Sequence, residues 1–259
     1  MTIDPATALR LDGRVAIVTG GTRGIGRAIA EAFARAGAGV VVVARRPHEL
    51  AETADALAAH DVGVATVQGS VGDPDTADAA AEVAVRELGR LDVLVNNAAV
   101  NPAFGPLTTV ELGAVEKVFD ANIVGPLRFT RAAWARWMAD HGGVILNVAS
   151  IGGIRPGPFI GAYNVSKAAL IHLTRQLALE LAPTVRVNAV APALVKTDMA
   201  RALWEPNEAA MAASHALGRL GVPDDIASIA LFLCSDAASW MTGECVVVDG
   251  GAGVVARGG

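Results

Sequence analysis

The stretch VAIVTGGTRGIGRAIAEAFARAGAGVVVVARR, residues 15–46, decides the fold. A strand-forming run, Val15–Thr19, passes into a turn with glycines at positions 20, 21, 24 and 26, and an alanine-rich helix and a second apolar strand follow. Glycine permits positive φ angles and lets the backbone approach a ligand closely. The helix after the turn offers unpaired N–H groups and the positive end of its dipole to a phosphate. This order of elements predicts a dinucleotide-binding βαβ unit.

The rest of the chain repeats this alternation of strand and helix. Apolar runs of strand length occur at Val15–Thr19, Val40–Ala44, Gly63–Val67, Leu91–Asn96, Val144–Ala149, Val185–Val190 and Cys245–Val248. Amphipathic stretches predict helices over Gly24–Ala36, His48–His60, Asp75–Leu88, Leu112–Ala139, Ala162–Ala182 and Asp224–Ser235. Apolar strands separated by helices are typical of a parallel sheet covered on both faces. We therefore expect an α/β chain with a Rossmann-type, doubly wound parallel sheet of about seven strands.

Two longer segments interrupt this rhythm. Residues 97–108 form a loop rich in alanine, proline and glycine, and residues 193–220 separate the sixth strand from the next helix. Both follow strands, so both are expected at the carboxyl edge of the sheet, where ligands bind in such folds. We predict a single dinucleotide-binding domain over residues 1–259, with a substrate lid near residues 193–220.

Composition and charge exclude several classes of function. The 259 residues are 53% apolar and 18% charged, with a formal net charge of −5 and no Lys/Arg stripe, so neither a nucleic acid nor an anionic membrane is an expected partner. The apolar runs are too short to span a bilayer. Met1–Arg10 lacks the profile of a signal peptide and the C-terminal residues are not a peroxisomal signal, which predicts a cytoplasmic protein. Cys234 and Cys245 have no ligand-spaced partner, so we expect core packing and no metal.

The residues after the second strand bear on the choice of cofactor. A carboxylate usually stands there in NAD-selective sites, where it holds the ribose hydroxyls and repels a 2′-phosphate. This chain has Arg45 and Arg46 instead. Arg45 is placed to meet the phosphate, Arg23 in the turn adds a second charge, and Arg46 is interpreted as a solvated side chain. The sequence therefore predicts NADP(H) in preference to NAD(H).

Tyr163 and Lys167 form the candidate catalytic pair. They stand four positions apart at the start of a predicted helix, so their side chains share a face. A free tyrosine ionises near pH 10, too high for a base at neutral pH. A neighbouring ammonium, together with the positive nicotinamide of an oxidised cofactor, favours the phenolate and is expected to lower the pKa of Tyr163.

These motifs in this order resemble the short-chain dehydrogenase/reductase family over essentially the whole chain. The resemblance rests on the turn Thr19–Gly26, the Asn96-Asn97-Ala98 segment, Asn122, Ser150 and the Tyr163/Lys167 pair. It implies that Tyr163 donates a proton to a carbonyl oxygen in reduction and removes it from an alcohol in oxidation. Ser150 would hydrogen-bond the same oxygen. Lys167 would bind the nicotinamide ribose, and Asn122 would interrupt its helix and hold a water that relays protons to Lys167.

The resemblance also implies a set of cofactor-binding positions. They are Gly20, Thr22, Arg23, Ile25, Arg45, Ser70, Val71, Asn96, Ala98, Tyr163, Lys167, Pro192, Val195 and Thr197. Three positions depart from the usual pattern. Ala99 and Ala193 stand where glycines are common, and Ser70 stands where an aspartate commonly contacts adenine. None of the three touches the proton transfer.

Two substrate classes remain open at this point. Residues 97–105 resemble NADPH-dependent carbonyl reductases, whereas much of the chain is also similar to 3-oxoacyl-carrier-protein reductases. An acidic carrier protein needs basic residues at the active-site rim. The positions where we would look for them read Asp140-His141 and Pro183-Thr184, although Arg155 or Arg201 could substitute.

Apolar residues near the predicted site allow two interpretations. Phe159, Met199, Leu203 and Trp204 either pack the lid and a subunit contact or line a pocket for a bulky ketone. The chemistry indicates a small-molecule carbonyl or alcohol as the substrate. A regulatory protein without catalysis is disfavoured, because Tyr163 and Lys167 are both present. Since family members are commonly tetramers, the resemblance also implies a homotetramer.

Overall fold

The computed structural model of the chain describes residue 4 and residues 7–255. The expectations drawn from the two chain ends therefore fall largely outside the described residues. Seven parallel strands form one sheet in the order β3-β2-β1-β4-β5-β6-β7, which is the doubly wound arrangement predicted from the sequence. The strands are β1 (Val15–Thr19), β2 (Gly39–Ala44), β3 (Val64–Gln68), β4 (Val93–Asn96), β5 (Gly143–Val148), β6 (Val185–Pro192) and β7 (Cys245–Val248).

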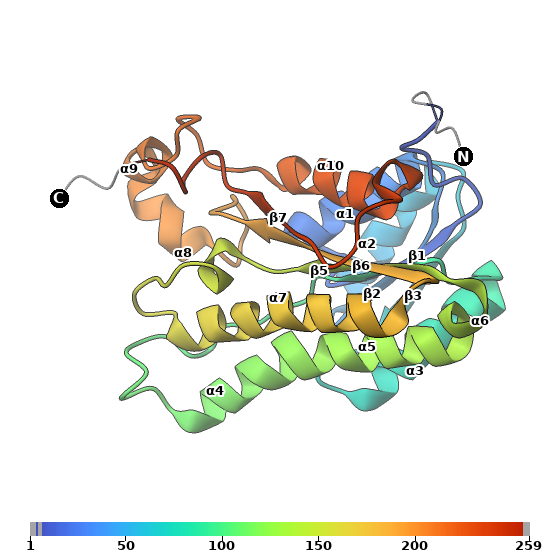
Figure 1. The fold of residues 1–259 in the computed structure, drawn as a ribbon, viewed down its shortest axis with the longest axis horizontal. Coiled ribbons are helices and arrows are strands. Elements are labelled where there is room, and N and C mark those ends of the chain that lie inside the picture. Colours follow the sequence, from blue (N-terminus) through green and yellow to red (C-terminus); the bar gives the residue numbers. More distant parts are fainter. Residues whose placement is uncertain (1–3, 5–6, 256–259) are drawn as a thin grey trace.

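Helices cover both faces of this sheet, and Figure 1 shows the three layers. One face packs against α1 (Gly24–Arg35), α2 (Pro47–Ala58) and α10 (Pro223–Cys234). The other packs against α3 (Pro74–Leu88), α5 (Gly125–Ala133) and α7 (Gly161–Leu181). The central strands are valine-rich and buried on both sides, because two apolar helix layers enclose them. Cys234 lies fully buried in the first of these cores.

The long helix predicted over Leu112–Ala139 is present, but two π-helical turns interrupt its regular α-helical pattern. It consists of α4 (Leu112–Phe119), a π-helical turn η1 (Asp120–Val124), α5, a second π-helical turn η2 (Trp134–Met138) and α6 (Ala139–His141). The periodicity of apolar residues does not reveal where one extra residue is inserted into a turn. Such π-turns occur frequently at functional sites, and η1 contains Asn122.

Helix α3 illustrates how local sequence fixes the element boundaries. The carboxylate of Asp73 accepts a hydrogen bond from the N–H of Asp75 (3.1 Å), and Pro74 follows at the first helical position. Both features begin a helix. Gly89 ends it in the left-handed region (φ 83°), where a residue without a side chain is favoured.

The segment after β6 is the one for which the sequence predicted a substrate lid. It contains the short helices α8 (Arg201–Trp204), η4 (Glu205–Asn207) and α9 (Glu208–Ala213). In Figure 1 it lies beyond the carboxyl ends of the strands, on the side where α7 begins. A parallel bridge between Val195 and Gly221 closes its base. This segment therefore lies beside the edge of the sheet at which ligands bind in this architecture.

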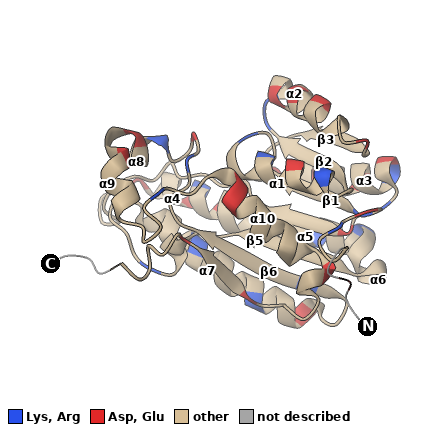
Figure 2. Cartoon of the chain, turned by 90° about the horizontal axis from the view of Figure 1, so that it is seen from above, with Lys and Arg blue, Asp and Glu red and all other residues tan. Residues whose placement is uncertain are grey.

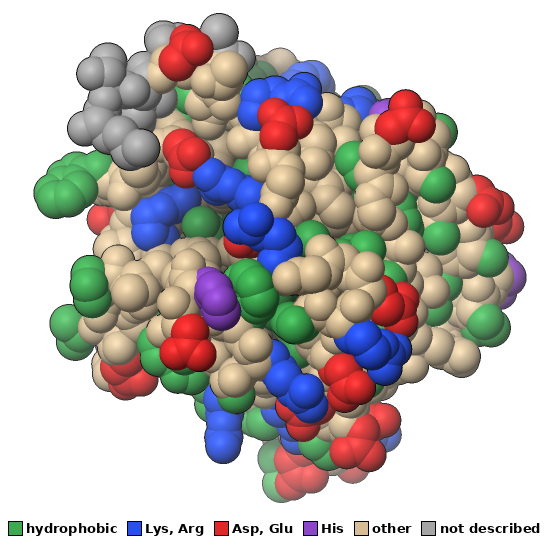
Figure 3. Space-filling view, turned by 90° about the vertical axis from the view of Figure 1, so that its right-hand side faces the viewer, with side chains coloured by type: hydrophobic (Ala, Val, Ile, Leu, Met, Phe, Trp, Pro, Cys, Tyr) green, Lys and Arg blue, Asp and Glu red, His purple; other side chains and the backbone are tan. Residues whose placement is uncertain are grey.

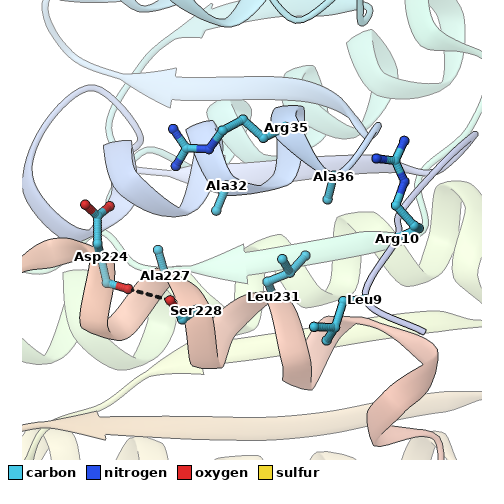
Figure 4. A pocket seen from close by; sticks show the side chains of 9 residues that line it. All are labelled: Leu9, Arg10, Ala32, Arg35, Ala36, Asp224, Ala227, Ser228 and Leu231. Carbon is cyan, nitrogen blue, oxygen red and sulfur yellow. Dashed lines mark hydrogen bonds between the residues drawn. The ribbon is translucent and has the colours of Figure 1, made fainter. Parts of the chain in front are cut away.

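Lys, Arg, Asp and Glu are distributed over most elements of the cartoon in Figure 2, and on the face in Figure 3 basic side chains lie beside acidic ones. Within the described part of the chain, no helix is long and apolar enough to cross a bilayer. A shallow groove of about 400 Å³ runs between α1 and α10, and Figure 4 shows Arg10 and Arg35 at its edge. Arg10 is bonded to Asp12 (2.9 Å), and Arg35 lies 3.9 Å from Glu31. Arg10 thus has its own acidic partner, whereas Arg35 shares Glu31 with Arg27.

Candidate active site

The glycine-rich turn between β1 and α1 has the shape that its sequence predicts. Gly20 (φ 64°) and Gly24 (φ 54°) lie in the left-handed backbone region. A Cβ atom on Gly26 would stand 2.3 Å from the carbonyl oxygen of Gly20, so the turn closes tightly onto the first turn of α1. Only glycine fits there. The turn and the helix N-terminus form a cradle of backbone atoms that suits a pyrophosphate.

The turn is tied to the loop that follows β4. The hydroxyl of Thr19 accepts hydrogen bonds from the N–H groups of Asn97 (2.9 Å) and Ala98 (3.1 Å). In return, the side-chain amide of Asn97 donates to the carbonyl of Thr19 (2.8 Å). These bonds hold two neighbouring strand ends together and fix one wall of the site.

A single cavity of about 680 Å³ runs along the carboxyl ends of the strands, from the turn to the lid. It brings together most of the site residues predicted from the sequence. Those that line it are Gly20, Thr22, Arg23, Ile25, Arg45, Ser70, Val71, Ala98, Ser150, Tyr163, Lys167, Pro192, Val195, Thr197, Met199 and Leu203. The adenosine end and the catalytic end of the predicted site are therefore parts of one continuous space.

Asn96 is one predicted cofactor residue that does not line this cavity. Its side chain is buried and donates to Oδ1 of Asn147 on β5 (2.9 Å). Asn147 in turn donates to the hydroxyl of Thr174 on α7 (2.9 Å). Asn96 therefore joins the sheet to α7 through Asn147, and its neighbour Asn97 faces the cavity instead. The sequence prediction named Asn96, but side chains alternate along a strand, and here the Asn97 side of the strand end faces the cavity.

Phe159 and Trp204 also lie outside the lining of the cavity. The Phe159 ring stacks on Phe104, with centroids 5.8 Å apart, and Phe104 lines the cavity. Phe159 has a positive φ of 63°, an uncommon conformation for a bulky residue. The indole N–H of Trp204 points to the carbonyl of Thr197 (3.5 Å), and the ammonium of Lys196 lies over its ring. These two aromatic side chains support the wall and the lid, and Phe104 was missed from the sequence.

Tyr163 and Lys167 lie on the first turns of α7, as their spacing predicts. The Lys167 ammonium is 5.5 Å from the centroid of the Tyr163 ring and donates to the carbonyl of Val148 at the end of β5 (2.8 Å). Ser150 stands just beyond that strand, and its hydroxyl accepts a hydrogen bond from Gly152 (3.1 Å). The ends of β5 and α7 thus bring the three groups to one point of the cavity.

Burial controls the protonation of this pair. It raises the pKa of Tyr163 to about 12, while a hydrogen bond with Ser150 acts in the opposite direction. It also lowers the pKa of Lys167 to about 7. The sequence predicted a lowered tyrosine pKa, and in the protein alone the effect of burial is larger than any stabilisation of the phenolate. The phenol therefore keeps its proton throughout the neutral range.

Asn122 does not line the cavity and lies fully buried behind it, where it connects three segments. Its side-chain N–H groups donate to the carbonyl of Val100 (3.1 Å) and to the hydroxyl of Ser166 (3.0 Å). Its oxygen accepts from the N–H of Val100 (2.9 Å). Ser166 then donates to the carbonyl of Tyr163 (2.7 Å). Asn122 interrupts its helix as predicted, and its side chain links the loop after β4 to the catalytic helix.

The adenosine end of the cavity contains both basic and acidic groups. Arg45 lines this end of the cavity, and its exposed side chain has no acidic partner among the described residues. Arg46 is not free in the solvent, because its guanidinium pairs with Glu49. Glu49 also accepts a hydrogen bond from the hydroxyl of Thr22 (2.9 Å) and lines the cavity. The sequence prediction rested on the residues at the end of the second strand and missed this carboxylate. Glu49 lies four residues after Arg45, in the first turn of α2.

Comparison with known proteins agrees with this geometry. Residues 20–253 match the family model described as enoyl-(acyl carrier protein) reductase. This chain belongs to the short-chain dehydrogenase/reductase family. It is therefore an oxidoreductase of a family that uses a nicotinamide cofactor.

Individual relatives cover nearly all of the chain. "Dehydrogenase/reductase SDR family member 4" from Homo sapiens is 41% identical over 244 residues, which are 93% of this chain and 88% of the relative. A short-chain dehydrogenase/reductase structure from Mycobacterium marinum superposes with a TM-score of 0.91 at 33% identity, covering 96% and 99% of the two chains. The structure of 7α-hydroxysteroid dehydrogenase with NADH and 7-oxo glycochenodeoxycholic acid also gives 0.91 at 33% identity, covering 96% and 98%.

Proposed function

We propose that this chain is an NADP(H)-dependent reductase of bulky apolar ketones, which also oxidises the corresponding secondary alcohols, with Tyr163 as acid and base. The observation that carries the proposal is the convergence of Tyr163, Ser150 and Lys167 in one cavity with a glycine cradle at its other end. The glycine turn fits a dinucleotide because side chains are absent where the pyrophosphate would lie.

The chemistry divides between cofactor and protein. The nicotinamide supplies or accepts the hydride at the carbonyl carbon. Tyr163 donates its phenolic proton to the carbonyl oxygen in reduction, and its raised pKa keeps that proton available at neutral pH. The Ser150 hydroxyl donates a hydrogen bond to the same oxygen and stabilises the negative charge that develops there.

Lys167 acts beside the phenol. Its ammonium favours the phenolate that remains after proton donation, and it holds the nicotinamide ribose. Because burial lowers its pKa to about 7, it exchanges protons readily near neutral pH and suits return of a proton to Tyr163. In the oxidation direction, Tyr163 must first lose its proton, so oxidation requires a higher pH than reduction.

The preference for NADP(H) follows from Arg45. Its guanidinium lies at the adenosine end of the cavity and has no acidic partner among the described residues, which leaves it available to a 2′-phosphate. Arg23 lies on the same wall. Arginine binds phosphate through charge-assisted hydrogen bonds that a ribose hydroxyl cannot match.

The cavity wall favours a bulky apolar ketone over an acyl carrier protein. Phe104, Met199 and Leu203 line it, and all three are substantially exposed in the chain alone. The two arginines that could receive an acidic carrier protein already have partners. Arg155 donates to the carbonyl of Ala252 (3.2 Å) and lies 3.7 Å from a carboxylate, and Arg201 also pairs with an acid. Reduction of 3-oxoacyl thioesters remains the second candidate, on the overall resemblance.

Self-association through the long helices is part of this proposal. Several large apolar side chains are exposed on α4, η1 and α7, namely Leu112, Val124, Val165 and Leu179. Exposed apolar side chains on these helices would gain free energy by burial against another subunit. We expect a homotetramer, and sedimentation as a monomer would contradict this.

The experiment is a panel of ketones and alcohols with NADPH and NADH in parallel. We expect the largest kcat/KM for aromatic or alicyclic ketones with NADPH, and Tyr163→Phe should bind NADPH normally but lose turnover. Unchanged turnover in this variant would overturn the mechanism. Faster reduction of acetoacetyl thioesters than of any simple ketone would favour the second candidate, and a preference for NADH would show that Arg45 does not select the cofactor.

A further inference from the structure

We propose that Glu49 sets the balance between NADP(H) and NAD(H) in this chain. Its carboxylate would compete with the 2′-phosphate for the Thr22 hydroxyl and the Arg46 guanidinium at the adenosine end of the cavity. The proposal rests on the proposed function, since it requires that the adenosine part of the cofactor lies near Arg45. It adds a specificity-determining residue that opposes the arginines.

The position of Glu49 places a carboxylate where an anion would enter. Glu49 lies on the first turn of α2, directly after the segment with Arg45 and Arg46, and it lines the same cavity. Its side chain is only 19% exposed. A charge held this close to the binding space is poorly screened by solvent, so it acts on any ligand charge nearby.

The contacts of Glu49 occupy groups that a phosphate would use. One carboxylate oxygen accepts the hydroxyl proton of Thr22 (2.9 Å), and the other pairs with the guanidinium of Arg46. A threonine hydroxyl has a single proton to donate. While Glu49 holds it, Thr22 cannot donate to a phosphate, and part of the positive charge of Arg46 is neutralised.

Glu49 carries a full negative charge at neutral pH. Burial alone would raise its pKa, but hydrogen bonds from Thr22 and Arg46 and the nearby charge of Arg23 lower it. A 2′-phosphate brought to Arg45 therefore meets a carboxylate in the same cavity, and like charges repel. A free 2′-hydroxyl carries no charge and is a donor that a carboxylate accepts, so NAD(H) does not experience this repulsion.

The structure thus combines two opposing selectors at one end of the cavity. Arg45 and Arg23 favour the phosphate, whereas Glu49 disfavours it and tolerates the hydroxyl. Removal of the charge at Glu49, with its shape retained, should sharpen the preference for NADP(H). Glutamine is the suitable replacement, because its side-chain oxygen still accepts the hydrogen bond from Thr22.

The test measures cofactor binding to the protein without substrate. Dissociation constants of NADP⁺ and NAD⁺ are determined by calorimetry for the wild-type chain, Glu49→Gln and Glu52→Gln. Glu52 is an exposed acid on the same helix that does not line the cavity, so it controls for a general change of charge. We expect Glu49→Gln to tighten NADP⁺ binding about tenfold, with NAD⁺ binding unchanged or weaker and Glu52→Gln close to wild type.

The outcomes separate this inference from the proposed function. Equal changes for both cofactors, or weaker NADP⁺ binding in a Glu49→Gln variant whose thermal unfolding matches wild type, would overturn the role of Glu49. If Glu49→Gln proves unstable, Glu49→Ala replaces it, and an unchanged ratio of the NADP⁺ and NAD⁺ dissociation constants in that variant would count against the role of Glu49 equally. Arg45→Ala tests the proposed function separately, because unaltered NADP⁺ binding in that variant would refute the phosphate site itself.

Discussion

Replacement of Lys167 by methionine should stabilise the fold while abolishing turnover, and the gain should depend on pH. The Lys167 side chain is 2% exposed, and burial lowers its pKa from 10.5 to about 7. The unfolded chain therefore binds more protons than the folded chain between pH 7 and pH 10.5, and the free energy of unfolding of the wild type rises with pH through this window. Methionine has a similar length and does not titrate, so the variant lacks this contribution.

The magnitude follows from the two pKa values. Burial of the titrating lysine costs about 4 kcal/mol at pH 7 and about 2 kcal/mol at pH 9. The variant also loses the hydrogen bond to the Val148 carbonyl, which subtracts about 1 kcal/mol at either pH. The advantage of Lys167→Met over wild type should therefore be about 3 kcal/mol at pH 7 and about 1 kcal/mol at pH 9.

Urea unfolding at both pH values, followed by tryptophan fluorescence, measures these differences. The exposed Lys117 provides the matched control, because Lys117→Met should leave the pH dependence of stability as in wild type. If the stabilities of Lys167→Met and wild type differ by the same amount at both pH values, the lysine is not held in a site that lowers its pKa. Loss of stability in the variant at both pH values would refute the reasoning as well.

Two further substitutions test the groups around the site. Ser166→Ala removes the hydroxyl that connects Asn122 to the carbonyl of Tyr163. It should lower kcat about tenfold and the free energy of unfolding by about 1 kcal/mol, while the NADPH dissociation constant stays the same. An unchanged kcat in stopped-flow reduction would show that this connection does not position the phenol. Phe104→Ala removes an aromatic wall, so KM for an aromatic ketone should rise several-fold with no change for a small aliphatic ketone, and equal changes for both would contradict an aromatic contact.

The sequence was sufficient for the sheet and for the placement of Tyr163 beside Lys167, because both depend on local patterns. Continuous valine-rich strands and glycines at fixed offsets have few structural solutions. Tyr163 and Lys167 share a helix face at a spacing of four, whatever surrounds them. Ser150 follows a strand end, and strand ends of a parallel sheet meet at one edge. Periodicity and chain direction therefore placed these residues, whereas the roles given to them came from the family resemblance.

Other features depended on tertiary contacts that periodicity does not encode. The inserted residue of a π-helical turn leaves the apolar pattern nearly unchanged, so periodicity did not indicate the second such turn, Trp134–Met138, and the interruption at Asn122 was expected only from the family resemblance. The Asn96 side chain lies in the core and Asn97 lines the cavity, because consecutive side chains of a strand point to opposite faces. The raised pKa of Tyr163 comes from burial, which the sequence does not quantify. The hydrogen bond between Thr22 and Glu49 joins two residues that are 27 positions apart, and the local pattern around either residue does not indicate it.

Tyr163 is the only tyrosine in the sequence, so the protonation state of its phenol can be measured directly. The near-ultraviolet absorbance of tyrosinate, followed against pH with and without oxidised cofactor, reports this single group. We predict that no tyrosinate forms below pH ~10 in the protein alone, since its pKa is about 12, and that oxidised cofactor shifts its formation to lower pH. Tyr163→Phe should abolish the signal. Tyrosinate formation near pH 10 that oxidised cofactor does not shift would contradict the role proposed for Tyr163.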